Sequence, residues 1–174
     1  MKTMHIINAQ FQPINFQIEN NDFGINQDFI DSLDIALCDV GFPTPMVKIQ
    51  TELSNKIILK FMETYGHFTD DANEIRCHQR LNYKYDGVFI TDEIRIGLEI
   101  QFRPDFLKDI TRFQIGFHSN EIKAMIYIVA IDRNNINPNY TSMPQYNRVV
   151  DQLNLFSWLQ VPILVVGINC NNNF

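Results

Sequence analysis

The sequence is poor in cysteine and lacks any long apolar run. Its three cysteines, Cys38, Cys77 and Cys170, are too few and too widely spaced for a disulfide framework or a metal-ligand motif. The longest apolar run, 161–168, has the length of a strand, whereas a membrane helix needs roughly 18 residues. The amino terminus has no long apolar signal segment. We therefore expect reduced thiols, no membrane partner and a cytoplasmic location.

Positive charge is also scarce. The chain has 14 Lys and Arg residues against 20 Asp and Glu residues, a formal net charge of −6. Domains that bulk charge holds to nucleic acid are usually basic, so this balance disfavours that class. It leaves open a nucleic-acid enzyme whose acidic residues gather around a cation and whose basic residues act locally.

The remaining composition is that of a globular protein. Hydrophobic residues make up 45% and charged residues 20% of the chain, close to the globular average. We find no internal repeat and no linker rich in Pro, Gly or Ser. The sequence therefore predicts a single domain over residues 1–174 with a sizeable core.

Periodic patterns place the secondary structure. Apolar residues at helical spacing predict helices at about 27–40, 51–65 and 149–158 and after Pro104. Alternating or continuous apolar residues predict strands within 5–18 and at 85–90, 94–102, 122–131 and 161–168, with a loop or weak strand at 67–80 and a frayed tail at 169–174. This order indicates an α/β fold of the α+β type, a mixed sheet flanked by helices.

The hairpin of 85–90 and 94–102 carries the residues of most chemical interest. Asp86 opens its first strand, and Glu99 and Gln101 end its second. Because side chains alternate along a strand, Glu99 and Gln101 share one face while Ile100 points into the core. The hairpin should fold Asp86 back beside Glu99, and such oxygens are the ligands that Mg²⁺ takes. The alternative is that these acids are ordinary solvated surface residues.

This constellation resembles a known nuclease core. Asp86-x(12)-Glu99-x-Gln101 on a hairpin, then a helix and an apolar strand, is similar to the PD-(D/E)xK nucleases. Gln101 stands where most members have Lys, which resembles type II restriction endonucleases of the BglII/BstYI group. The resemblance covers about 51–168, the expected catalytic core. The sequence departs from the family pattern at two points: Tyr85, not Pro, precedes Asp86, and the hairpin is longer than expected for the group. Asp92 is therefore the alternative to Asp86 as the first acid.

The resemblance implies a role for each residue of the site. Asp86 and Glu99 would bind Mg²⁺, with Mn²⁺ as a substitute and the carbonyl of Ile100 as a further ligand. Gln101 cannot act as a base and would orient the attacking water. Asn55 would help to position water, or it is a plain helix-surface amide. Hydrolysis would leave 5′-phosphates on double-stranded DNA.

Two segments are candidates for reading DNA. The polar segment 133–148 is long for a loop, and its Asn, Gln, Arg and Ser side chains suit base edges, although Asn is abundant throughout the chain. A second candidate follows the helix after Pro104. The expected base contacts are Arg133, Asn134, Asn135, Asn137, Ser142, Gln145, Arg148, Ser119 and Asn120, and the expected phosphate contacts include Lys56, Arg103, Lys108 and Arg112.

The predicted activity is therefore that of a type II restriction endonuclease. A single domain that cuts both strands would most simply act as a homodimer on a short palindrome. The resemblance implies the same dimer, a target that centres on GATC and a companion DNA methyltransferase. Two alternatives stay open. One is a non-specific or structure-selective nuclease on the same core. The other is a catalytically inactive DNA-binding or interaction module, which Gln101 in place of Lys and the acidic charge both favour.

Overall fold

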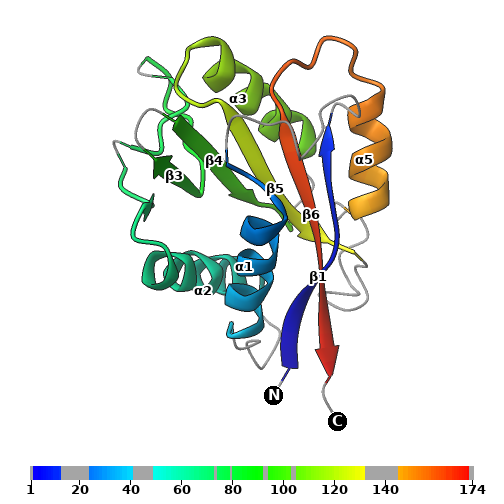
Figure 1. The fold of residues 1–174 in the computed structure, drawn as a ribbon. Helices are drawn as coiled ribbons and strands as arrows, with labels where there is room; N and C mark the ends of the chain where they lie inside the picture. Colours follow the sequence, from blue (N-terminus) through cyan, green and yellow to red (C-terminus); the bar gives the residue numbers. More distant parts are fainter. Residues whose placement is uncertain are drawn as a thin grey trace.

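The part of the chain that the structure describes forms one mixed sheet of six strands with helices on both faces (Figure 1). The computed structural model describes residues 2–12, 24–40, 49–72, 74–78, 80–91, 94–102, 105–131 and 145–172. The strands are β1 (Lys2–Gln12), β2 (Phe68–Thr69), β3 (Gly87–Thr91), β4 (Ile94–Ile100), β5 (Ala124–Ala130) and β6 (Ile163–Asn172), in the order β1-β6-β5-β4-β3-β2. Strands β4, β5 and β6 are parallel and the other pairs antiparallel. The predicted fold class is confirmed.

The helices begin and end close to where the apolar periodicity predicts. They are α1 (Gln27–Cys38), α2 (Ile49–Thr64), α3 (Phe106–His118) and α5 (Tyr146–Asn154). At the start of α1 the side chain of Asn26 accepts a hydrogen bond from the backbone N–H of Phe29 at 2.9 Å, which satisfies one of the free donors of a helix start. No helix in the described part of the chain is long and apolar enough to cross a membrane.

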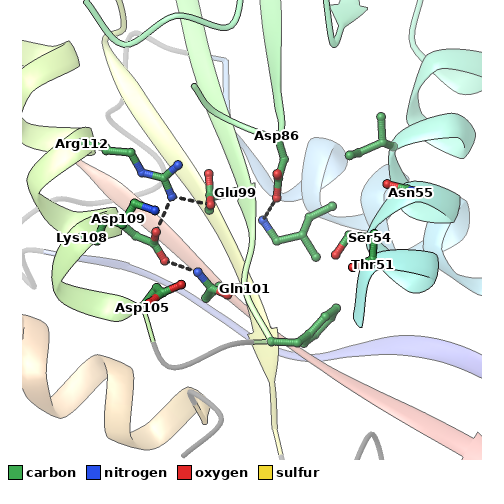
Figure 2. A pocket seen from close by; sticks show the side chains of 13 residues that line it. Thr51, Ser54, Asn55, Asp86, Glu99, Gln101, Asp105, Lys108, Asp109 and Arg112 are labelled. Atoms are coloured by element: carbon green, nitrogen blue, oxygen red, sulfur yellow. Dashed lines mark hydrogen bonds and ion pairs between the residues drawn. The ribbon is translucent and has the colours of Figure 1, made fainter. Parts of the chain in front are cut away.

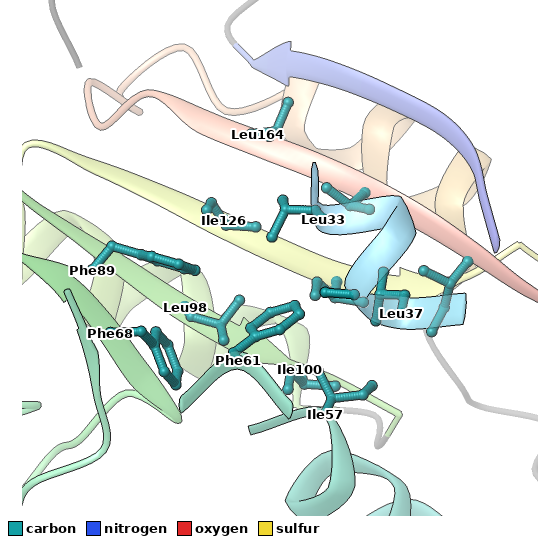
Figure 3. Packing of buried hydrophobic residues seen from close by; sticks show 14 of the residues in the cluster. Leu33, Leu37, Ile57, Phe61, Phe68, Phe89, Leu98, Ile100, Ile126 and Leu164 are labelled. Carbon is teal, nitrogen blue, oxygen red and sulfur yellow. The ribbon is translucent and has the colours of Figure 1, made fainter. Parts of the chain in front are cut away.

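Two apolar layers hold the helices to the sheet. On one face, α1 and α2 pack on alternate residues of the central strands, including Leu98, Ile126 and Leu164 (Figure 3). On the other face, α3 and α5 pack on the intervening residues, such as Tyr127 and Val165. Every residue of β5 is buried, as expected for a strand covered on both sides. The central strands are therefore fixed from above and below.

Two sequence predictions about the carboxyl-terminal part were wrong in detail. The helix predicted at 149–158 begins at Tyr146 and ends at Asn154, because buried Tyr146 extends the apolar stripe of Val149 and Leu153 by one turn. The tail predicted to fray from residue 169 continues β6 to Asn172, because residues 169–172 pair with residues 2–5 of β1. This pairing joins the two ends of the chain, and local periodicity carries no information about it.

The aromatic cluster beneath β3 makes a clear prediction about stability. Phe61 on α2 is fully buried and lies against the rings of Tyr65, Phe68 and Phe89. We expect Phe61→Ala to lower the free energy of unfolding by about 3–5 kcal/mol in a urea titration. Leu59→Ala, on the exposed side of the same helix, should change it by less than about 1 kcal/mol. Equal losses in the two variants would contradict this packing.

Candidate functional site

A polar cleft of about 260 Å³ opens where β3 begins and β4 ends (Figure 2). Helix α2 forms one wall of the cleft, α3 forms the other, and the hairpin of β3 and β4 forms the floor. Three residues predicted for the site, Asp86, Glu99 and Gln101, line this cleft together. The other polar lining residues are Thr51, Ser54 and Asn55 from α2, and Asp105, Lys108, Asp109 and Arg112 from α3 or just before it.

The register of the hairpin brings the acidic residues together. Gly87 pairs with Leu98, and the backbone N–H of Asp86 donates to the carbonyl of Leu98 at 3.0 Å. The carboxylate of Asp86 accepts in turn from the backbone N–H of Ile100 at 2.8 Å. Asp86 is therefore fixed beside the end of β4, next to Glu99, as the hairpin prediction requires.

Glu99 is a buried carboxylate with one oxygen paired. Its side chain lies on the α3 face of the sheet and is 5% exposed, and its Oε1 lies 2.5 Å from Nη2 of Arg112. Its Oε2 is buried without a hydrogen-bond partner among the described residues. Burial raises the pKa of Glu99 well above its usual range, the carboxylate of Asp86 raises it further, and Arg112 partly opposes both.

Arg112 connects Glu99 on β4 with Asp109 on α3. The same Nη2 that contacts Glu99 also forms an ion pair with Asp109, and Nη1 donates to the carbonyl of Lys84 at 2.7 Å. Burial lowers the pKa of the guanidinium, but the carboxylates of Glu99 and Asp109 outweigh this and raise the pKa above its usual value. The sequence analysis expected Arg112 at DNA phosphates. The structure turns it inward instead, because two buried carboxylates need a partner.

Gln101 and its partners extend the network under the cleft. Nε2 of Gln101 donates to Oδ2 of Asp109 at 2.6 Å, and the hydroxyl of Tyr127 donates to the same oxygen at 3.0 Å. Asp109 is fully buried and Gln101 nearly so. Sequence reasoning missed Asp109 and Tyr127. Their only signal is that Asp109 falls on the buried stripe of α3, between Phe106 and Phe113, where an acid needs a buried partner.

The cleft is acidic overall. Four carboxylates line it, from Asp86, Glu99, Asp105 and Asp109, against the cations of Lys108 and Arg112. No group of three or more His, Cys, Asp or Glu side chains in the described ranges is arranged to hold a metal by itself. Asp86 and Glu99 nevertheless fit a hard divalent cation, because Mg²⁺ is commonly bound by one or two carboxylates and completes its shell with water and phosphate.

The two residues predicted on α2 lie differently. Asn55 is exposed and lines the cleft on the wall opposite α3. Lys56 does not line it, and its ammonium lies 4.0 Å from the carboxylate of Glu52 one turn earlier. Asn55 can therefore reach toward a ligand in the cleft, whereas Lys56 lies beside it.

The predicted DNA-reading residues fall into three groups. Gln145 bridges to Ala130 at the end of β5, and Arg148 is exposed on the first turn of α5, so both lie at the edge of the sheet where β4 also ends. Ser119 and Asn120 follow the far end of α3, about 20 Å from its first turn at 1.5 Å per residue. The structure does not bring them to the cleft. Arg103, Arg133, Asn134, Asn135, Asn137, Ser142 and the fallback acid Asp92 lie outside the described residues.

Comparison with known proteins identifies the fold and its family. A family model described as restriction endonuclease BglII/BglIII matches residues 8–168. The chain belongs to this family of restriction endonucleases. The match begins in β1 and includes residues 8–50, which lie before the range of about 51–168 over which the sequence resembles the family.

A solved structure of a restriction endonuclease shows the same fold. The crystal structure of restriction endonuclease BglII complexed with a DNA 16-mer has a TM-score of 0.63 and 17% sequence identity, and the match covers 92% of this chain and 76% of that chain. The crystal structure of free BglII has a TM-score of 0.46 and 22% identity over 68% of this chain and 57% of that chain. A search of the curated proteins found no match.

The buried ion pairs predict a large cost for removing Arg112. In Arg112→Met, Glu99 and Asp109 keep their burial but lose their shared cation. We expect the free energy of unfolding to fall by about 3–5 kcal/mol, as for other buried pairs that lose one member. Lys108→Met, an exposed change one turn away on α3, should cost less than about 0.5 kcal/mol. Urea titrations check this, and an Arg112 variant as stable as the Lys108 variant would contradict the pairing.

Proposed function

We propose that this protein is a type II restriction endonuclease that hydrolyses phosphodiester bonds of double-stranded DNA at a specific sequence, depends on Mg²⁺ and leaves 5′-phosphates. One observation carries the proposal. In a chain of the BglII/BglIII family, Asp86, Glu99 and Gln101 meet in one cleft at the end of the hairpin. The acidity of the cleft supports a cation as intermediary, because carboxylates alone would repel a DNA phosphate.

Asp86 and Glu99 would hold the divalent cation, with the backbone carbonyl of Ile100 as a third ligand. Oε2 of Glu99 supports this assignment, since it is buried without a hydrogen-bond partner among the described residues. When bound, the cation neutralises charge on the phosphodiester and lowers the pKa of a nearby water. Mn²⁺ should substitute, because it accepts the same oxygen ligands.

Gln101 would orient the attacking water. A neutral amide cannot take up a proton at working pH, so its contribution is a hydrogen bond from a fixed position. Asn55, on the opposite wall of the cleft, would help to place the water or the phosphate. In-line attack on phosphorus, with the 3′ oxygen as leaving group, gives the 5′-phosphate ends.

Sequence specificity would come from the edge of the sheet beside the cleft. Gln145 and Arg148 lie there, and both side chains can form paired hydrogen bonds with base edges. The other residues of segment 133–148 that are expected to contact bases would act in the same way; they are Arg133, Asn134, Asn135, Asn137 and Ser142. A homodimer would present two such edges to a palindrome, and GATC is the proposed centre of that palindrome. A companion methyltransferase would protect the host sites.

The first test is digestion of unmethylated phage DNA by the purified protein in Mg²⁺ or in EDTA. We expect discrete fragments only with the metal. DNA ligase should join their ends without prior kinase treatment, because DNA ligase requires 5′-phosphates. A metal-dependent smear would favour a non-specific nuclease. Intact DNA in both Mg²⁺ and Mn²⁺, with DNA binding kept, would favour an inactive binding module and overturn the proposal.

The role of Glu99 gives a matched pair of variants. Glu99→Gln should lower the cleavage rate by about a hundredfold or more, because loss of a metal ligand costs several kcal/mol of transition-state stabilisation. DNA binding in Ca²⁺ should persist. Glu63→Gln makes the same chemical change at an exposed position of α2 and should cleave like the wild type. Unchanged cleavage by Glu99→Gln would remove this carboxylate from the reaction.

A further inference from the structure

Asp109 collects hydrogen bonds from three elements of the fold. It is fully buried on α3, where its Oδ2 accepts from Gln101 beyond β4 at 2.6 Å and from Tyr127 on β5 at 3.0 Å. Its Oδ1 is paired with Arg112 on its own helix. Neither composition nor the resemblance to nucleases assigned any role to this residue. A buried carboxylate with three donors aimed at it is a fixed point of the site.

The contact with Gln101 decides which end of its amide faces the cleft. A glutamine amide carries a donor nitrogen and an acceptor oxygen, whereas an ionised carboxylate can only accept. Asp109 therefore takes the nitrogen of Gln101, so the oxygen of the same amide lies on the side away from Asp109, in the lining of the cleft (Figure 2). If the amide were flipped, two oxygens would face each other. The cleft would then present a donor where the attacking water needs an acceptor.

The neighbours of Asp109 are all hydrogen-bond donors. The guanidinium of Arg112 neutralises its charge in the buried site. Burial and the adjacent carboxylate of Asp109 raise the pKa of Tyr127 well above its usual range, so its hydroxyl stays protonated and donates. Because Arg112 also contacts Glu99 at 2.5 Å, the same helix fixes Glu99 and Gln101 relative to each other.

We propose that Asp109 is a positioning residue for DNA cleavage: it fixes the amide of Gln101 so that the acceptor oxygen faces the cleft, and through Arg112 it holds Glu99 in register. The inference rests on the proposed endonuclease function. It assigns Asp109 no contact with DNA or with the reacting atoms. It predicts that the orientation of the amide at position 101, and not its presence alone, sets the rate.

A reciprocal exchange tests this orientation. Asp109→Asn places a donor group where Gln101 now finds only acceptors, so the amide can flip. We expect a single-turnover rate about 10- to 100-fold below the wild type, which is the usual loss when a residue that orients an active-site ligand is mutated. The DNA dissociation constant measured in Ca²⁺ should not change.

Gln101→Glu alone sets two carboxylates face to face and should also be slow. In the double variant Asp109→Asn/Gln101→Glu a donor meets an acceptor again, and the rate should recover at least about tenfold over Asp109→Asn.

Nuclear magnetic resonance gives a readout that does not depend on activity. The side-chain amide of Gln101, identified by its loss in Gln101→Glu, should exchange slowly with solvent in the wild type because its donor is bonded and buried. In Asp109→Asn it should shift and exchange faster. Asp70→Asn, an exposed carboxylate beyond β2, is the matched control and should match the wild type in both rate and spectrum.

The outcomes separate this inference from the proposed function. If the wild type cleaves DNA with none of the divalent metals, the proposed endonuclease function is overturned, whatever the NMR signal of the Gln101 amide shows. A wild type that cleaves, with Asp109→Asn equally fast, overturns the positioning role. Loss of DNA binding in step with the rate, or a double variant no faster than Asp109→Asn, would also overturn it, because Asp109 would then act only through the general integrity of the fold.

Discussion

The pairing of Arg112 with two buried carboxylates is the constraint on which the site depends. Glu99 and Asp109 are withdrawn from water between α3 and the sheet, where an unpaired charge is expensive. The guanidinium that pairs with them also contacts the backbone at Lys84, just before the hairpin. One side chain therefore ties α3 to β4 and to the start of β3, which are the elements that enclose the cleft.

The sheet keeps this polar group apart from the main apolar layer. Alternation along β4 turns Leu98 and Ile100 toward α1 and α2 and turns Glu99 toward α3. Tyr127 faces Glu99 across the parallel pair β4–β5 and carries the hydroxyl that bonds Asp109. The result is a rigid apolar support on one face and a hydrogen-bonded acidic cleft at its edge, which suits a site that must hold groups in fixed positions.

The sequence predicted the part of the site that depends on local rules. Alternation placed Glu99 and Gln101 on one face, and the hairpin brought Asp86 beside them, because both follow from the geometry of neighbouring strands. The partners Asp109 and Tyr127 could not be predicted, since they meet Gln101 only after α3 and β5 dock. The β1–β6 pairing at the two ends of the chain escaped prediction for the same reason.

The most direct measurement of the central claim is a crystal structure of the protein soaked in Mn²⁺, with diffraction recorded above and below the manganese absorption edge. The account predicts an anomalous peak in contact with the carboxylates of Asp86 and Glu99 in the wild type and none there in Glu99→Gln. A peak elsewhere, or none in a wild type that cleaves DNA with Mn²⁺, would contradict the assignment of these two carboxylates as the metal ligands.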